Sequence, residues 1–234
     1  MRTNTQRVSK VDYVYERLRA SIINGERPPG AVLDKAELAH EFGASRQPIA
    51  SALDRLESYG LVRIVPQHGS FVSKLDKKQI AGRFFVRRAI EVELMLAMDG
   101  RVTPDLIEQL DFNLRYQRVA LDARDYDSLY DWDQKFHDLI HARVPIDEAA
   151  RVLDRAEAFL SRCRRLMMPE PTRAGKTVSE HEAIRDALAA HDAQGAAAAM
   201  RAHMNAVQQH FDQFVIEQPE LFETDNSAPK LGRK

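Results

Sequence analysis

The chain has 234 residues, 44% of them hydrophobic and 29% charged, an ordinary composition for a folded protein of one or two domains. No apolar run approaches the ~20 residues that a membrane-spanning helix requires, and no secretory signal opens the chain, so we expect a soluble, cytoplasmic protein. A single cysteine, Cys163, excludes an internal disulfide, and we expect it to be a small buried side chain.

Charge is divided unevenly along the chain. The net charge is −1, but residues 1–78 carry 13 Lys and Arg against 9 Asp and Glu, whereas residues 79–234 carry 21 against 26. A basic N-terminal part joined to an acidic C-terminal part favours a polyanionic partner for the N-terminal part.

The N-terminal residues predict a small domain of helices and one hairpin. Residues 1–8 are polar and are expected to form a flexible arm. Three helices with apolar faces are predicted, at residues 9–24, 36–42 and 46–59. Two apolar, partly β-branched runs, 61–65 and 70–73, flank Pro66-Gln67-His68-Gly69 and predict a β-hairpin. This order indicates a winged helix-turn-helix domain over residues 9–75.

The third of these helices is predicted to be a DNA recognition helix. Ser45 is expected to cap its start, because a serine hydroxyl accepts a hydrogen bond from an early helix N–H. Four apolar side chains recur at helical spacing and predict one buried face: Ile49, Ala52, Leu53 and Leu56. Arg46 and Gln47 fall near the start on the opposite face, where such side chains reach base edges or phosphates.

The C-terminal part is predicted to be an antiparallel all-α bundle over residues 78–218. Six helices are expected, at residues 78–99, 104–122, 125–143, 147–167, 176–191 and 193–216. Breaks are expected at residues 100–104, at Pro145, at Pro169-Glu170-Pro171 and at Gly195. Short links favour antiparallel packing of neighbouring helices. The polar residues 219–234 are predicted to be a disordered tail.

Four side chains of this bundle form a candidate metal site. Asp133 and His137 are spaced i, i+4, so on a helix they lie one above the other. His181 and His203 lie on two later helices, and a bundle can bring all four together. One carboxylate and three imidazoles suit Zn²⁺, Ni²⁺, Mn²⁺ or Fe²⁺. The alternatives are a surface Asp–His pair, a polar core without metal, and His141 as a competing ligand.

Residues 14–73 resemble the N-terminal domain of the GntR family of bacterial transcription regulators. The matching residues are Leu18-Arg19, Ile22, Gly25, Pro29-Gly30, Leu33, Leu38-Ala39, Gly43, Ser45-Arg46-x-Pro48, Ala52-Leu53-x-x-Leu56, Gly60-Leu61, His68-Gly69 and Val72. The resemblance implies DNA contacts from the start of the third helix and from the hairpin tip: Ser45, Arg46, Gln47, His68 and Gly69. Lys35 is either a nearby phosphate contact or a solvated lysine. Where the family usually carries Arg and an acidic residue this chain has Ala50-Ser51, which changes the expected operator sequence.

Residues 80–215 resemble the ligand-binding domain of the FadR-type (FCD) subfamily of these regulators. The matching residues are Arg87-Arg88-Ala89-Ile90-Glu91, Asp133-x-x-x-His137 with Phe136, Glu180-His181 with Ala187-Leu188, and His203 with Ala198 and Met200. The resemblance implies a divalent metal ion held by one carboxylate and three imidazoles: Asp133, His137, His181 and His203. It also implies that Arg87 faces the pocket and pairs with a small carboxylate effector, an ordinary surface arginine being the alternative. Phe85 departs from the acidic residue usual at its position.

The resemblance implies a metabolite-responsive transcription regulator, with repression the commoner mode. A homodimer places two recognition helices on a palindromic operator. An organic acid bound in the bundle is expected to control DNA binding. Two other functions are considered: a regulator for which the metal is itself the signal, and a metal-dependent enzyme with Glu180 or Glu182 as base. The DNA-binding head argues against the enzyme.

Overall fold

The computed structural model describes residues 9–167 and 170–223, so the predicted arm at residues 1–8 lies outside the described residues. The chain divides into two compact units. The first comprises the described residues of Met1–Asp76 and Glu220–Lys234, and the second is Lys77–Pro219. The predicted mainly α fold, a winged helix-turn-helix domain and a helical bundle, is confirmed. Among the described residues, no helix combines the length and the apolar character that crossing a membrane requires.

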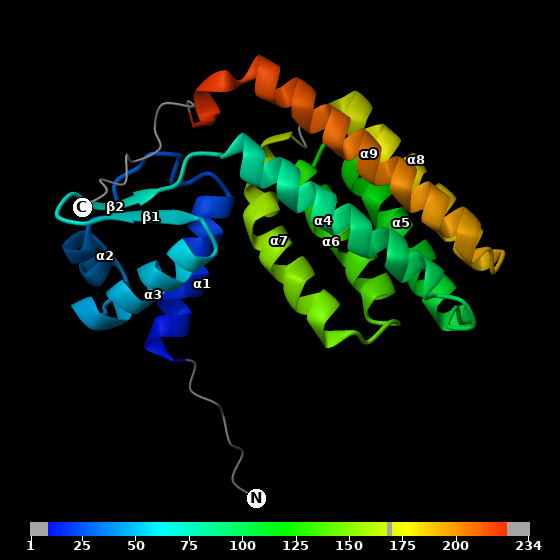
Figure 1. The fold of residues 1–234 in the computed structure, drawn as a ribbon, viewed down its shortest axis with the longest axis horizontal. Helices are drawn as coiled ribbons and strands as arrows, with labels where there is room; N and C mark the ends of the chain where they lie inside the picture. Colours follow the sequence, from blue (N-terminus) through cyan, green and yellow to red (C-terminus); the bar gives the residue numbers. More distant parts are fainter. Residues whose placement is uncertain (1–8, 168–169, 224–234) are drawn as a thin grey trace, which may run out of the picture. The chain divides into compact units, whose positions relative to one another are not determined.

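Among its described residues, the first unit contains three α-helices and a two-stranded antiparallel sheet (Figure 1). They are α1 (Lys10–Ile23), α2 (Lys35–Glu41), α3 (Arg46–Ser58), β1 (Val62–Val65) and β2 (Gly69–Val72). The Asp34 carboxylate caps α2 by accepting hydrogen bonds from two early N–H groups. Each helix buries one apolar side in a common core that includes Val14, Leu18, Ile22, Leu38, Ile49, Leu53 and Leu56. Burial of each large side chain contributes roughly 1.5–3 kcal/mol.

The hairpin is attached to the segment that precedes α2. β1 and β2 pair antiparallel, with Val65 opposite Gly69 next to the turn. On the other edge of β2, the Leu33 N–H donates to the Ser70 carbonyl at 2.8 Å. The hairpin tip and the start of α2 are therefore held together, and both carry residues predicted to bind DNA.

The predicted disorder of the tail does not hold for residues 219–223. Pro219–Leu221 forms one turn of 3₁₀ helix, and Phe222 is only 1% exposed. The Leu75 N–H donates to the Leu221 carbonyl at 3.2 Å, and the Leu75 carbonyl accepts from the Glu223 N–H at 2.8 Å. Polar composition predicted disorder, but one buried aromatic ring and two backbone hydrogen bonds order this short segment. The rest of the predicted tail lies outside the described residues.

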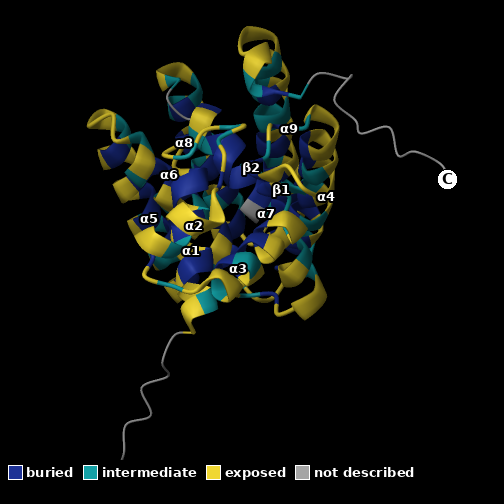
Figure 2. Cartoon of the chain, turned by 90° about the vertical axis from the view of Figure 1, so that its left-hand side faces the viewer, coloured by how far each residue is buried: buried dark blue, intermediate teal, exposed yellow. Residues whose placement is uncertain are grey.

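The second unit is a bundle of α-helices. They are α4 (Lys77–Leu96), α5 (Pro104–Asp122), α6 (Tyr126–His141), α7 (Asp147–Met167), α8 (Pro171–Ala189) and α9 (Ala193–Glu217). α4 packs against α7 and α9, and α8 packs against α9 and α5, which in turn packs against α6. The long helices α4 and α9 lie side by side in Figure 1. Figure 2 shows that the helices bury one side and expose the other, as expected of amphipathic helices.

Two features of α8 and α9 differ from the prediction. α8 begins at Pro171 instead of residue 176, because the Glu170 carboxylate accepts from the Thr172 N–H at 3.0 Å and proline is tolerated in a first turn. The sequence predicts a break at Gly195, but this residue lies in the first turn of α9 and its N–H donates to Asp192 at 2.8 Å. A Cβ at position 195 would collide with the Asp192 carboxylate, so glycine makes room for this cap.

Candidate functional site

The start of α3 presents side chains predicted to bind DNA. Arg46 and Gln47 are exposed in the first turn, whereas Ile49 and Leu53 are fully buried on the opposite face. Ser45 occupies the N-cap position, but its hydroxyl makes no capping hydrogen bond, contrary to the prediction. The early N–H groups of α3 therefore receive nothing from this side chain, which suits a helix end that faces a phosphate.

The hairpin tip carries two further predicted DNA-binding residues. Gln67 has a φ of 63° and Gly69 a φ of 114°, so the turn uses the left-handed region that glycine adopts most easily. The Nδ1 atom of exposed His68 lies 2.9 Å from the Pro66 carbonyl oxygen and donates to it. Lys35, His68 and Gly69 line one hollow of about 430 Å³, so the structure brings these three predicted residues together.

Three of the four predicted metal ligands meet in the core of the second unit. His137 lies on α6, His181 on α8 and His203 on α9, and each is at most 2% exposed. One ring nitrogen from each lies within 4.8 Å of the other two. The ring centroids are 4.7 to 5.5 Å apart. We call these three residues the histidine triad.

Each ring of the histidine triad is held by a hydrogen bond at Nδ1. The partners are Glu91 Oε2 for His137 at 3.0 Å, Gln117 Oε1 for His181 at 2.9 Å, and Glu180 Oε2 for His203 at 2.8 Å. Amide and carboxylate oxygens accept, so Nδ1 donates in all three rings and Nε2 carries the lone pair. Among the described residues, the buried Nε2 atoms of His137 and His181 lack a hydrogen-bond partner. Buried lone pairs without a partner are costly, and a bound metal ion satisfies them.

The protonation states also fit a metal site. Burial lowers the pKa of His137, and burial together with His203 lowers the pKa of His181 well below its usual value. For Glu91, burial alone would raise the pKa, but His137 and Arg87 hold it well below its usual range. Neutral imidazoles backed by an ionised carboxylate are the forms that bind a divalent ion.

Asp133, the fourth predicted ligand, lies beside the histidine triad and is 1% exposed. Its Oδ1 is 3.7 Å from His181 Nε2, whereas its Oδ2 is paired with the Arg164 guanidinium on α7. Burial alone would raise the pKa of this carboxyl, but the Arg164 guanidinium holds it far below its usual range. One oxygen of Asp133 therefore faces the triad and the other faces an arginine.

Arg87, predicted to bind the effector, is buried among carboxylates. Its Nε donates to Glu91 Oε1 at 2.8 Å and its Nη1 to Glu157 Oε2 at 2.9 Å. Because Glu91 also holds His137, Arg87 supports the histidine triad through Glu91. Arg87 does not line the hollow beside Asp133, so its role in effector binding stays a prediction.

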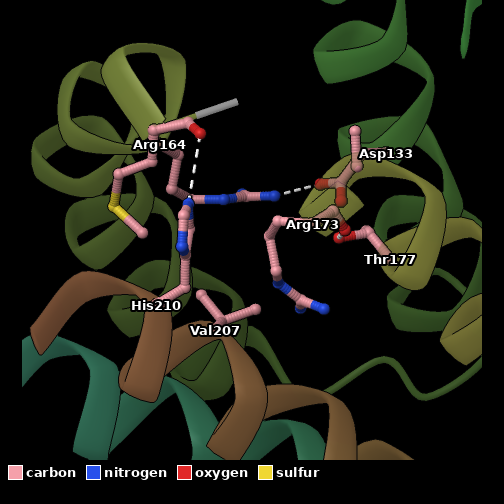
Figure 3. Close-up of a pocket in the computed structure, with 8 residues that line it drawn as sticks. Asp133, Arg164, Arg173, Thr177, Val207 and His210 are labelled. Carbon is pink, nitrogen blue, oxygen red and sulfur yellow. Dashed lines mark hydrogen bonds and ion pairs between the residues drawn. The ribbon is translucent and has the colours of Figure 1, made fainter. Parts of the chain in front are cut away.

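That hollow has a volume of about 40 Å³ and contains two arginines that the sequence did not single out (Figure 3). The Arg164 side chain extends to the Asp133 carboxylate. Arg173, from α8, pairs with both carboxylate oxygens of Glu180 at 2.7 and 2.8 Å. Glu180 in turn holds His203. Arg164 thus pairs with the predicted ligand Asp133, and Arg173 reaches the histidine triad through Glu180.

Other candidate residues have structural partners. His141 Nε2 lies 3.1 Å from Glu91 Oε2, so it shares that carboxylate with His137 instead of joining the histidine triad. His210 lines the hollow, and its Nε2 lies 3.2 Å from the Met167 carbonyl oxygen. Burial raises the pKa of the Cys163 thiol to about 12, in agreement with the expected buried side chain.

The sequence did not indicate the residues that hold the histidine triad and Asp133 in place. Asn113 and Gln117 are polar residues spaced i, i+4 on the buried face of α5, and that pattern was a usable signal. Glu91 follows Arg87 at i+4 and offered a similar signal. Arg164 and Arg173 gave none, because only the packing of α7 and α8 places them beside Asp133. Glu180, considered as a catalytic base, is engaged by Arg173 and His203.

Comparison with protein families and known proteins agrees with this architecture. Residues 10–72 match the model "Bacterial regulatory proteins, gntR family" and residues 83–206 match the FCD domain. An uncharacterized HTH-type transcriptional regulator in an unstable DNA locus of Streptomyces ambofaciens is 34% identical over 94% of this chain and 92% of its own length. The HTH-type transcriptional repressor RspR of Escherichia coli K12 is 28% identical over 89% and 92%.

A solved structure shares the fold. The chain of E. coli McbR/YncC aligns with a TM-score of 0.75 and 20% sequence identity, covering 89% of this chain and all of that one. The names of the two relatives described above identify them as HTH-type transcriptional regulators. The chain belongs to the GntR family of bacterial transcription regulators, with an N-terminal helix-turn-helix domain and a C-terminal FCD domain.

Proposed function

We propose that this protein is a cytoplasmic repressor that binds a palindromic operator as a homodimer and is controlled by a small carboxylate. The carboxylate binds beside a divalent metal ion in the C-terminal bundle. The name of the E. coli relative, a transcriptional repressor, supports repression. A dimer presents two copies of α3, which suits two half-sites one helical turn apart. The side chains proposed to contact DNA are those of Arg46, Gln47, His68 and Lys35. Ser45 contributes its hydroxyl and backbone groups, and Gly69 contributes its backbone.

The metal proposal is supported chiefly by the orphaned Nε2 atoms of His137 and His181. With His203 they offer three nitrogen ligands, and Asp133 offers an oxygen close to His181. This donor set suits Zn²⁺, Ni²⁺, Mn²⁺ or Fe²⁺. When bound, such an ion supplies a Lewis-acidic contact for an effector oxygen.

The carboxylate proposal is supported by the two arginines of the hollow. A volume of about 40 Å³ accepts a group the size of a carboxylate, and a larger effector requires the arginines to move. Arg164 is bound to Asp133, so an effector that takes over its hydrogen bond changes how α6 and α7 are linked. Arg173 pairs with Glu180 within α8, and Glu180 in turn holds His203 on α9. An effector shifts a conformational equilibrium only through such differential contacts.

The proposal is tested by operator binding in the presence of metal and carboxylates. Purified protein selects its operator from random double-stranded DNA, and fluorescence anisotropy then measures affinity with a panel of small mono- and dicarboxylates. We expect at least one carboxylate to weaken operator binding by the Zn²⁺-loaded protein. Its uncharged amide should have no effect, and Arg173→Met should reduce the change in operator affinity that the carboxylate causes.

Two outcomes would replace this function with another. Operator release by Zn²⁺ alone, with no response to any carboxylate, would identify the metal as the signal. Absence of any sequence preference in the selected DNA would remove the assignment of a specific operator. Arg165→Met, which removes the same charge from a pair with the exposed Asp127, is the matched control for Arg173→Met.

A further inference from the structure

Two buried amides connect the backbone of α6 to one histidine of the metal site. The Asn113 side-chain amide donates to the Trp132 carbonyl at 3.0 Å, and the Gln117 amide donates to Asn113 Oδ1 at 2.7 Å. His181 Nδ1 then donates to Gln117 Oε1 at 2.9 Å. Asn113 is 1% exposed, and Gln117 and His181 are fully buried. The burial of these side chains limits competition from solvent, so the geometry of the bonds is decided within the protein.

The donor and acceptor roles along this series of hydrogen bonds are fixed at the Trp132 carbonyl. A backbone carbonyl can only accept, so Asn113 must turn its NH₂ group toward Trp132 and its oxygen toward Gln117. Gln117 must then turn its NH₂ group toward Asn113 and its oxygen toward His181. His181 consequently carries its proton on Nδ1, and its Nε2 lone pair is left for the metal site. The ring plane is held as well, because Phe136 stacks on His181 at 4.3 Å with an interplanar angle of 9°.

We propose that Gln117 is the positioning residue of His181 and that its neutral amide limits the metal affinity of the site. This inference rests on the proposed metal site. His137 and His203 donate to the carboxylates Glu91 and Glu180, and a carboxylate partner strengthens an imidazole as a ligand. His181 donates to an amide, which carries no charge, and is therefore the weakest donor of the three. Gln117 fixes the tautomer of His181 without adding the electron density that a glutamate would add.

Two substitutions at this position separate positioning from packing. Gln117→Leu removes the acceptor for His181, whereas Gln117→Glu keeps an acceptor and adds a negative charge. Both remove the hydrogen bond to Asn113, so they differ mainly in what they offer His181. Gln109→Leu, on the same helix but in an exposed hydrogen bond to Asp105, is the matched control.

The first measurement uses metal-free protein. Long-range ¹H–¹⁵N NMR spectra of the histidine rings, at neutral pH, should show His181 protonated only at Nδ1 in the wild type and in Gln109→Leu. Gln117→Leu should lose this preference and populate the Nε2-protonated tautomer. An unchanged His181 tautomer in folded Gln117→Leu would overturn the proposal. This result is obtained whether or not the protein binds metal, so it is independent of the metal proposal.

The second measurement is Zn²⁺ affinity by competition with a chelating dye. Gln117→Leu should weaken binding about tenfold or more, in line with other partners of metal-bound histidines, and Gln117→Glu should tighten it several-fold. Weakening by both substitutions would mean that the site needs only intact packing around Gln117, which contradicts the proposal. Failure of the wild type to bind Zn²⁺ would refute the metal site, and the NMR result would still decide the role of Gln117.

Discussion

Replacement of Arg164 by methionine removes one partner of a buried ion pair next to the histidine triad. The side chains of Arg164 and Asp133 are 7% and 2% exposed. Arg164 also donates to Glu157 at 2.9 Å, but Glu157 retains Arg87 at 2.9 Å and the Tyr130 hydroxyl at 3.0 Å. Asp133 keeps no positively charged close partner, because its other close partner is His181 and the low pKa of His181 keeps that ring neutral near pH 7. The cost of the substitution therefore falls on Asp133.

Loss of one partner from a buried pair costs about 3–5 kcal/mol, since an uncompensated charge remains. The native pKa of Asp133 lies below the unfolded value of about 3.9 in the wild type, so the ionised group stabilises the fold at neutral pH. That contribution is lost as the pH falls through the native pKa. Without Arg164, burial raises the native pKa of Asp133. The variant therefore has a lower free energy of unfolding than wild type at neutral pH, and this loss becomes smaller as the carboxyl is protonated. The difference from wild type should therefore shrink between pH 7.5 and pH 5.

Urea unfolding of metal-free protein measures this difference. Trp132 is the only tryptophan and directly precedes Asp133, so its fluorescence reports on the second unit. Arg165→Met is the control on the same helix, because Arg165 pairs with Asp127 and Asp131, which are 88% and 69% exposed, and such pairs contribute ~0–1 kcal/mol. The double variant Asp133→Asn/Arg164→Met should recover much of the lost free energy of unfolding, because it no longer contains the unpaired buried charge. A loss for Arg164→Met below about 1 kcal/mol, or one equal at both pH values, would refute this reasoning.

Three further predictions concern DNA and metal. Arg46→Ala should cost about 1–3 kcal/mol, or roughly 5- to 150-fold in operator affinity measured by mobility shift, whereas Arg55→Ala at the other end of α3 should change it little. His68→Ala should weaken operator binding several-fold in the same assay, and an unchanged affinity would exclude the hairpin tip from the interface. Chelation of Zn²⁺ present at about a hundredfold excess over Kd should remove ~2.7 kcal/mol and lower the Tm of the second unit by roughly 5–10 °C. His203→Ala should melt like the chelated protein and ignore chelator, whereas His191→Asn, exposed in the turn after α8, should respond like wild type.

The fold could be predicted because its determinants are local. Apolar residues at helical spacing placed α3 and the helices of the bundle, and the β-branched runs on either side of Pro66 placed the hairpin. The predicted helix boundaries and the predicted disordered tail are wrong where contacts of a single side chain outweigh the local amino-acid composition. The Glu170 carboxylate extends α8 toward its N-terminus, the Asp192 carboxylate carries α9 through Gly195, and burial of Phe222 orders the first tail residues.

The site could be predicted only in part. The i, i+4 spacing of Asp133 and His137 was visible in the sequence, and the resemblance to FCD domains added His181 and His203. The orientation of the imidazole rings was not visible, because it depends on acceptors contributed by α4, α5 and α8. The same reason explains Arg87: the sequence shows a charged residue on a helix, and only the fold shows that carboxylates from α4 and α7 surround it.

The central claim is that the histidine triad holds one divalent metal ion, and metal stoichiometry tests it most directly. Metal-free protein is dialysed against a slight excess of Zn²⁺ and then against buffer, and bound metal is measured by elemental analysis. We predict one Zn²⁺ per chain for the wild type and for His191→Asn, and none retained by His181→Ala, which loses a fully buried ligand. A wild type that retains no Zn²⁺, Ni²⁺ or Mn²⁺, or a His181→Ala variant that retains a full equivalent, would contradict the claim.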